Sequence, residues 1–284
     1  MKRYLAIIDN SAIPPNVSHI KDISEEEFLA YEQSKQVVDE THHLMDLFLI
    51  HKLNFHEIFD FQTEDINEIL SDCEDPMNIG NDKYTFLKVE INRLLFNYLS
   101  SFRMFTDHCG RKIKHRFGIK SQDYIDFKLM TNKMFDNIFA YRFICELRDY
   151  CQHSGIAVTD FALSKQPKFV EIAFQFERDY LLEDKKKWKS AVKSDLEKMD
   201  EKFNINPILN DHFQAVEKLS EEINLLYQEK FMNALKYLDN FSRPYRNQDT
   251  LVILSESNKT ELGMQLTVHK FPFDLIDKFG NGFS

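Results

Sequence analysis

The clearest pattern of apolar and polar positions lies in the middle of the chain. From Asp82 to about Cys109, apolar residues recur every three or four positions, the period of an amphipathic helix, and Gly110 predicts its end. These apolar residues are Leu87, Ile91, Leu94, Leu95, Tyr98, Leu99, Phe102 and Phe105. A second, central helix is predicted from the polar cluster at Ser121 to a stop at Gly155. Two long apolar helices joined by a short turn predict an antiparallel hairpin, the unit of a helical bundle.

The segment before this hairpin predicts one strand and two helices. Residues 3–8 have the pattern of a short strand. Ser24 with Glu27 three positions later has the form of a capping box, which opens a helix predicted to run to about His51. A shorter helix is predicted near Thr63–Ser71, and residues 72–81 have the composition of a loop.

After Gly155 the spacing of apolar residues changes from a helical period to alternation. From Val170 to Phe176 apolar and polar residues alternate, which predicts a strand and, with the apolar residues before it, a hairpin. An amphipathic helix is predicted from the Asp184–Trp188 segment to about Phe203.

A longer helix is predicted over Ile208–Phe241, and its apolar stripe is either core or a face for a partner helix. Strands are predicted at Leu251–Leu254 and Met264–Val268. The fold class is therefore mainly α, of the α+β type: a helical bundle on a long helix hairpin, with a small β hairpin and further long helices. We expect a helical domain over residues 1–160 and an α+β region over residues 161–284.

Composition narrows the classes of function. The 284 residues include only 7 Gly and 7 Pro, which favours long helices, and 43% are hydrophobic. The formal net charge of −10 excludes a general polyanion-binding surface, so any contact with nucleic acid must be local. The most basic segment is predicted to lie in the connection between the two hairpin helices, where it is either a solvated turn or a contact for phosphate. Its basic residues are Arg111, Lys112, Lys114 and Arg116.

The cysteines, histidines and apolar runs indicate a soluble cytoplasmic protein. The four cysteines are scattered without a CxxC pair, as expected of reduced thiols. No apolar run reaches the roughly 20 residues that cross a bilayer, and the apolar run at the N-terminus ends at Asp9, too early for a secretory signal. His42, His43, His51 and His56 lack the spacing of a metal site, so we expect them to be solvated or buried in the core. No metal, cofactor or membrane partner is predicted.

The last turns of the central helix carry the candidate chemistry. On a continuous helix, steps of four, three and four residues place Arg142, Glu146, Asp149 and His153 along one face. Asp149 is then placed to hydrogen-bond His153 and to fix its tautomer. Arg148 lies about 140° around the helix from His153. The two side chains meet one ligand only if the last turn unwinds or if a second chain supplies its own pair.

An arginine and a histidine suit phosphate chemistry. A guanidinium clamps a phosphodiester with two hydrogen bonds, and an imidazole exchanges protons near neutral pH. Because no carboxylate cluster surrounds the pair, the chemistry would need no metal. RNA is the natural substrate, since its 2′-hydroxyl is a built-in nucleophile.

The segment Arg148-Asp149-Tyr150-Cys151-Gln152-His153 resembles the signature of the HEPN superfamily (higher eukaryotes and prokaryotes nucleotide-binding). That signature is an Arg, a polar residue, three further residues and a His near the end of a helix in a helical bundle. The resemblance covers about residues 82–155. It implies a metal-independent endoribonuclease whose site forms where two copies face each other, and a role as a toxin or anti-phage effector with an antitoxin or defence-system partner. Arg148 would bind the scissile phosphate, His153 would act as acid or base, and Asp149 would be the polar second residue.

Further residues and a second interpretation accompany this hypothesis. Arg142, Gln152 and the four basic residues from Arg111 to Arg116 are predicted to contact the substrate, with that basic segment near Arg148. A second copy of the spacing, Arg103 to His108, has Met104 in place of the polar residue and is interpreted as chance or as groove lining. The alternative to a nuclease is a non-catalytic helical module that binds RNA, a nucleotide or a protein.

Overall fold

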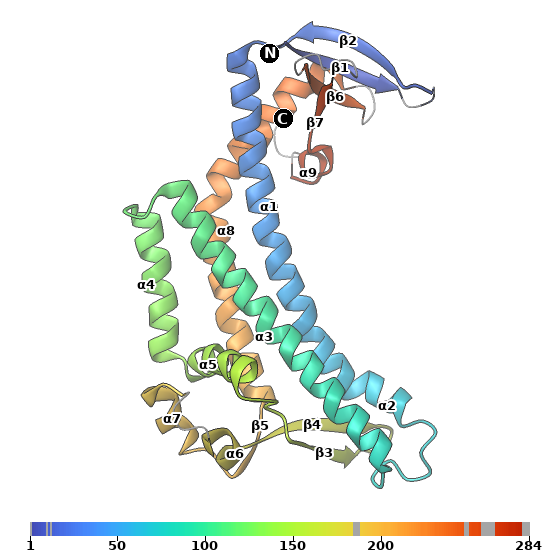
Figure 1. Ribbon diagram of the computed structural model, residues 1–284, viewed down its shortest axis with the longest axis vertical. Helices are drawn as coiled ribbons and strands as arrows, with labels where there is room; N and C mark the ends of the chain where they lie inside the picture. The colour runs from blue at the N-terminus through green and yellow to red at the C-terminus, as the bar shows by residue number, and fades with distance from the viewer. Residues whose placement is uncertain are drawn as a thin grey trace. The chain divides into compact units, whose positions relative to one another are not determined.

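The computed structural model describes residues 2–9, 11, 13–183, 188–246, 250–256 and 265–279. It confirms the predicted class: the chain is mainly helical, with small antiparallel sheets (Figure 1). The chain forms two compact units, one of residues 44–223 and the other of residues 1–43 together with residues 224–284. These units differ from the predicted division near residue 160, which placed the two ends of the chain in separate domains.

The unit built from both ends of the chain holds a four-stranded antiparallel sheet with the strand order β2-β1-β6-β7. The strands are β1 (Arg3–Asp9), β2 (Asn16–Asp22), β6 (Leu251–Glu256) and β7 (Leu266–Lys270). The strands predicted at residues 3–8 and Leu251–Leu254 are confirmed as β1 and β6. The strand predicted at Met264–Val268 begins at Leu266, and Met264 lies outside the described residues.

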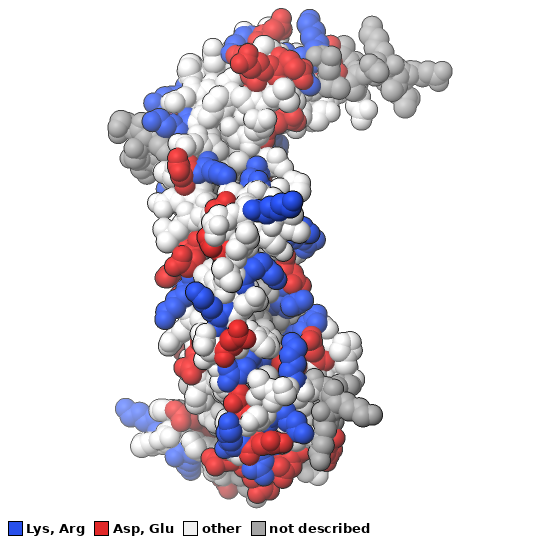
Figure 2. All heavy atoms as spheres, turned by 90° about the vertical axis from the view of Figure 1, so that its left-hand side faces the viewer, with Lys and Arg blue, Asp and Glu red and all other residues white. Residues whose placement is uncertain are grey.

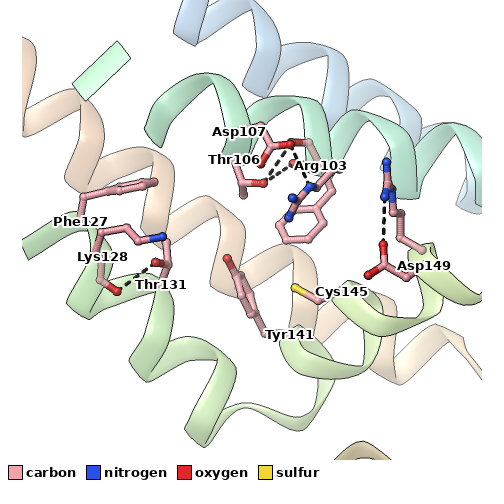
Figure 3. A pocket seen from close by; sticks show the side chains of 11 residues that line it. Arg103, Thr106, Asp107, Phe127, Lys128, Thr131, Tyr141, Cys145 and Asp149 are labelled. Carbon is pink, nitrogen blue, oxygen red and sulfur yellow. Dashed lines mark hydrogen bonds and ion pairs between the residues drawn. The ribbon is translucent and has the colours of Figure 1, made fainter. Parts of the chain in front are cut away.

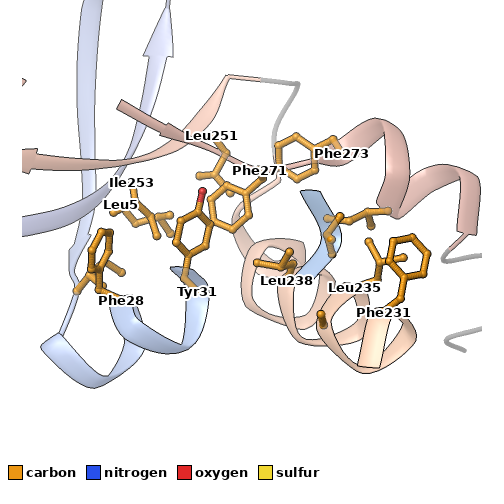
Figure 4. Close-up of a cluster of buried hydrophobic side chains, with 14 residues drawn as sticks. Leu5, Phe28, Tyr31, Phe231, Leu235, Leu238, Leu251, Ile253, Phe271 and Phe273 are labelled. Atoms are coloured by element: carbon orange, nitrogen blue, oxygen red, sulfur yellow. The ribbon is translucent and has the colours of Figure 1, made fainter. Parts of the chain in front are cut away.

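The core of this unit is formed where the sheet packs on two helices (Figure 4). Leu5 and Ile253 come from the sheet, Phe28 and Tyr31 from α1 (Glu25–Asp60), and Leu238 from α8 (Asn206–Ser242). The short elements η2 (Arg243–Tyr245) and α9 (Phe273–Phe279) complete the unit. Burial of these apolar side chains is the main term that holds the two ends of the chain together.

Helix α1 begins with the predicted capping box. The Glu27 backbone N–H donates to Ser24 Oγ at 3.1 Å, and the Ser24 N–H donates to a Glu27 carboxylate oxygen at 2.9 Å. The helix extends past the predicted end at His51 because its apolar period continues through the buried Phe55 and Ile58. A π-helical segment η1 (Phe61–Asp65) and the short α2 (Ile66–Ile69) follow.

The unit of residues 44–223 contains the helices that carry the candidate site. These helices are α3 (Asn81–Phe117), α4 (Gln122–Asn137) and α5 (Phe139–His153). The prediction that the first hairpin helix ends at Gly110 is wrong, because α3 runs through that position to Phe117, and Gly118 follows its last residue. A Cβ built on Gly110 would lie 3.2 Å from the ring of Phe127, so the glycine permits close packing of α4 on α3. The basic segment from Arg111 to Arg116 therefore forms the last turns of α3, not a connection.

The predicted central helix is also corrected: it is two helices, separated at Ile138. This residue has an extended backbone (φ −110°, ψ 109°), and α5 turns away from α4 (Figure 1). The positions of the apolar residues explain why the helix breaks at Ile138. On one straight helix Ile138 would lie within about 20° of Phe127, whereas Leu147 would lie about 160° from it. One helix cannot bury both faces in one core, and the break allows each half to pack separately.

A three-stranded antiparallel sheet with the order β3-β4-β5 packs beside α5 in the same unit. Its strands are β3 (Asp160–Lys165), β4 (Val170–Glu177) and β5 (Lys202–Asn204). The predicted hairpin is confirmed by β3 and β4.

The helix predicted from the Asp184–Trp188 segment to Phe203 is corrected. Residues 184–187 lie outside the described residues, and α6 (Arg178–Glu183) precedes them. Between Trp188 and Phe203, only α7 (Ser190–Leu196) is helical. Trp188 is buried and stacks on Phe143 of α5 with ring centroids 5.8 Å apart, while Phe203 pairs with Phe176 in the sheet. Because Trp188 is buried against α5 and Phe203 is buried in the sheet, the segment between them does not form one continuous helix.

The long helix predicted over Ile208–Phe241 is confirmed by α8. Its apolar residues are buried within each unit, among them Val216 and Leu219 in one and Leu235 and Leu238 in the other. The stripe therefore forms core. Among the helices that the structure describes, none is long and apolar enough to cross a membrane.

Candidate functional site

Arg148 lies on α5 where this helix packs against α3. Its guanidinium Nη1 donates to a carboxylate oxygen of Asp149 at 2.9 Å. The Arg148 side chain is 27% exposed and that of Asp149 is 60% exposed. The Nε atom of Arg148 is buried and has no hydrogen-bond partner in the part of the chain that the structure describes. The guanidinium thus keeps hydrogen-bond donors that its neighbour does not use.

A cationic pocket of about 300 Å³ opens between α3 and the end of α5. Arg103 and Arg111 line it from α3, and Arg148 and Gln152 line it from α5. The remaining lining residues are Ser100, Met104, Asp107 and His108. Arg103 pairs with Asp107 at 2.9 Å, whereas Arg111 is exposed and forms no ion pair with another described residue. Three arginines and two carboxylates thus face this region, so it has a modest positive balance suited to one anionic group.

A smaller hollow of about 140 Å³ lies on the other side of Arg103, bounded by α3, α4 and α5 (Figure 3). Arg103 and Arg148 line this hollow as well as the cationic pocket. Phe127, Tyr141 and Cys145 form its inner wall. Burial raises the pKa of the Cys145 thiol to about 12 and raises that of the Tyr141 hydroxyl, so both side chains are protonated at neutral pH. Neither is an activated nucleophile.

His153 is the last residue of α5 and is exposed, but it lines neither hollow. The helix keeps regular geometry to its end, since the Ser154 N–H donates to the Tyr150 carbonyl at 2.8 Å. The unwound last turn that would bring Arg148 and His153 together within one chain is therefore not present. A shared ligand requires a second chain.

Arg142 and Glu146 face a different neighbour from Arg148. Arg142 donates to the carboxylate of Asp195 on α7 at 2.8 and 2.6 Å and to the Asp136 carbonyl at 3.2 Å. Glu146 is buried and accepts from Lys189, through the backbone N–H at 3.3 Å and through the ammonium at 2.7 Å. The predicted single face of Arg142, Glu146, Asp149 and His153 is thus divided, and Arg142 is an internal ion-pair partner, not a substrate contact of this pocket.

The predicted proximity of the basic segment to Arg148 is confirmed for Arg111 only, since Lys112, Lys114 and Arg116 do not line the cationic pocket. Of the two interpretations of the Arg103–His108 spacing, chance or groove lining, the structure supports groove lining, because both residues line this pocket. The signal that identifies them is the continuity of α3 past Gly110. On a continuous helix Arg103, Asp107 and Arg111 recur every four residues and share a face.

On the face shown in Figure 2, lysine and arginine side chains are interleaved with aspartate and glutamate, with no extended basic field. Together with the net charge of −10, this favours a local anion site over a broad basic surface. No group of three or more His, Cys, Asp or Glu side chains placed to hold a metal ion occurs among the described residues.

No protein-family model, curated protein or solved structure matches this chain.

Proposed function

We propose that this chain is a metal-independent endoribonuclease of the HEPN type that acts as a homodimer. The observation that carries the proposal is the position of Arg148. This arginine of the HEPN-like segment lines a pocket together with Arg103 and Arg111. Three guanidinium groups from two packed helices fit one phosphate group of RNA, with bidentate hydrogen bonds from Arg148. The exposed His153 at the end of the same helix is accessible to a second copy.

The proposed reaction is a transesterification within RNA. The 2′-oxygen attacks the adjacent phosphorus, the bond from phosphorus to the 5′-oxygen breaks, and a 2′,3′-cyclic phosphate and a 5′-hydroxyl are formed. A neutral imidazole takes the proton of the 2′-hydroxyl, or an imidazolium gives a proton to the leaving 5′-oxygen. Arg148 stabilises the negative charge that develops on the phosphorane oxygens. In this mechanism one copy supplies His153 and the other supplies Arg148.

The test is incubation of the purified protein with end-labelled RNA in EDTA. The expected result is cleavage by the wild type to products with 2′,3′-cyclic phosphate ends, lost by at least about a hundredfold in His153→Ala and in Arg148→Ala. His19→Ala is the matched control because His19 is an exposed histidine that pairs with Asp22 in the other unit. No cleavage by a folded, dimeric wild type at micromolar concentration would contradict the proposal.

The biological setting that we propose is a toxin or anti-phage effector restrained by a partner protein. Expression of the wild type should then arrest growth, and Arg148→Ala should relieve the arrest. Equal growth with both proteins at matched expression levels would contradict this setting without bearing on the cleavage assay.

The second candidate is a non-catalytic module that binds RNA, a nucleotide or a protein. It is favoured by the carboxylates beside Arg103 and Arg148, which reduce the positive charge of the pocket. Under this candidate, RNA binds without being cut, and His153→Ala binds it as well as the wild type does.

A further inference from the structure

A second hollow lies along α3 on the N-terminal side of the cationic pocket: Asn97, which lines the second hollow, is three residues before Ser100, which lines the cationic pocket. Phe96, Ser100, Arg103, Asp107 and Arg111 follow one another in steps of four, three, four and four residues, so they form one stripe on the exposed side of this helix. The second hollow, of about 600 Å³, lies at the N-terminal half of the stripe.

The chain around the end of α5 contributes to both hollows. Arg148 and Gln152 of α5 line the cationic pocket, and Ile156, three residues past the last residue of α5, lines the second hollow. We call the two neighbouring hollows the groove, with the second hollow as its apolar part and the cationic pocket as its cationic part.

The apolar part is unlike the cationic part in chemistry. Val89 is 63% exposed and Ile156 is 40% exposed, and the ring of Phe96 is half-buried beside them. The ring of Tyr84 is held in place, since it stacks on Phe161 with centroids 4.9 Å apart and its hydroxyl donates to Asp160 at 3.1 Å. Exposed apolar side chains at a rigid aromatic wall form a surface on which a flat, weakly polar group can stack.

The charges at this end are close to balanced. Arg93 and Lys88 line the hollow, and the Arg93 guanidinium is bound by Glu90 at 2.6 Å and by Glu57 at 2.9 Å. The three arginines Arg103, Arg111 and Arg148 lie in the cationic part, and the apolar surface lies at Val89, Phe96 and Ile156.

We infer that the apolar part is a base-binding subsite for single-stranded RNA whose backbone phosphates lie in the cationic part. A single strand carries unstacked bases and anionic phosphates along one chain, which matches an apolar hollow that follows an arginine pocket along the same helix. A duplex keeps its bases inside the helix and cannot fill the apolar part. The inference rests on the proposed function, because it names the substrate class of the same groove.

The experiment measures binding by fluorescence anisotropy in a His153→Ala background, which prevents cleavage. The probes are a short labelled RNA strand, the same strand as a duplex, and an abasic ribose-phosphate strand of equal length. We expect the single strand to bind at least about tenfold more tightly than the abasic strand, which is the gain in affinity expected from stacking of one or two bases. Val89→Glu and Phe96→Ala should bring this ratio close to one, whereas Arg103→Ala should weaken both strands alike.

The matched control is Leu225→Glu, which places the same charge at an apolar side chain that is 64% exposed on α8. It should bind like the parent protein. Because Val89 is exposed, its variant tests the inference even if Phe96→Ala does not fold. Equal binding of the RNA and abasic strands by the parent, or a ratio unchanged in Val89→Glu, would overturn the base-binding subsite and assign the hollow to another ligand such as a partner helix.

The inference and the nuclease proposal fail separately. Base-dependent binding that requires Val89, without any cleavage by the wild type, supports the subsite and overturns the nuclease. Cleavage by the wild type together with binding that ignores the bases supports the nuclease and overturns the subsite. A wild type that binds no RNA at all overturns both.

Discussion

Arg142 and Arg148 belong to the same helix, yet their guanidinium groups meet different surroundings. Arg142 is bound to Asp195 of α7 and is 15% exposed, whereas Arg148 opens on the cationic pocket with its Nε unpartnered among the described residues. Residue type and spacing predicted a substrate contact for both. The difference arises from which neighbour each side of α5 packs against, and this depends on the tertiary structure.

Arg142→Ala should therefore lower stability and leave binding intact. Loss of its charged hydrogen bonds should reduce the free energy of unfolding by about 1–2 kcal/mol, because Asp195 keeps its charge without this partner. Arg148→Ala should change the free energy of unfolding by less than about 0.5 kcal/mol and should abolish tight RNA binding. Urea denaturation and anisotropy measure the two effects. A larger loss of RNA affinity in Arg142→Ala than in Arg148→Ala would contradict this assignment.

Two buried histidines predict how stability depends on pH. His51 and His212 are fully buried, their rings are 6.0 Å apart, and their Nε2 atoms have no partner among the described residues. His51 Nδ1 lies 3.1 Å from Ser101 Oγ, and His212 Nδ1 lies 2.5 Å from the Tyr98 hydroxyl. Burial lowers the pKa of His51 to about 3 and lowers that of His212 as well, so both are neutral in the folded state.

Because the folded pKa values lie below the unfolded value of about 6.5, stability is complete above pH 6.5 and falls as the pH decreases from there toward 3. Below pH 6, the two histidines together should make the free energy of unfolding fall by roughly 3 kcal/mol for each pH unit of acidification. In His51→Leu this part of the slope should fall by about half. Denaturation between pH 4 and pH 8 measures it, and an unchanged slope in the variant would contradict the burial of a neutral His51.

At the scale of elements, the sequence pattern predicted most long helices and several strands, but it placed the end of α1 too early, misread Gly110 and Ile138, and joined the Asp184–Phe203 region into one helix. The capping box at Ser24, the alternation of β4 and the long stripe of α8 are local signals, and the structure confirms each. Gly110 and Ile138 were misread because their structural roles depend on packing partners. Gly110 accommodates Phe127, and Ile138 permits two apolar faces to turn to different neighbours.

The packing at Gly110 gives a prediction for the contact between α3 and α4. A leucine there must displace the ring of Phe127, which is 6% exposed, and should lower the free energy of unfolding by about 1–3 kcal/mol. Adding Phe127→Ala creates space, so the double variant should be more stable than the sum of the two single effects. Thermal unfolding of all four proteins forms the cycle. Additive effects would show that α4 does not pack on Gly110.

The candidate site was predictable to the same extent as the elements. The spacing of Arg148 and His153 was visible, and so was the basic segment that contains Arg111. Groove lining by Arg103 and His108 was one of two interpretations of their spacing, but their place beside Arg111 was not predicted, because a helix ending at Gly110 would have separated them from the basic segment. The apolar part of the groove was also not predicted. Val89 and Phe96 line it together with Ile156, which is far from them in the sequence and lies beside them only in the folded chain.

At the scale of the whole molecule, every residue of the candidate site belongs to the unit of residues 44–223, and the unit built from the two chain ends contributes none. The net charge of −10 and the mixed charges on the face shown in Figure 2 favour a local site over a broad anion-binding surface. Because Arg148 and His153 diverge on a regular helix, the proposed chemistry requires two copies. A two-fold dimer supplies each site with a guanidinium from one copy and an imidazole from the other.

Mixing of two inactive variants tests this composite site most directly. Arg148→Ala and His153→Ala should each be inactive alone. When the two are mixed and allowed to exchange subunits, half of the dimers should be mixed and should carry one intact site of two, which restores about a quarter of the wild-type cleavage rate in EDTA. Two inactive variants that stay inactive in mixed dimers, or a single variant that cleaves as fast as the wild type, would contradict an arginine and a histidine from two copies acting on one phosphate.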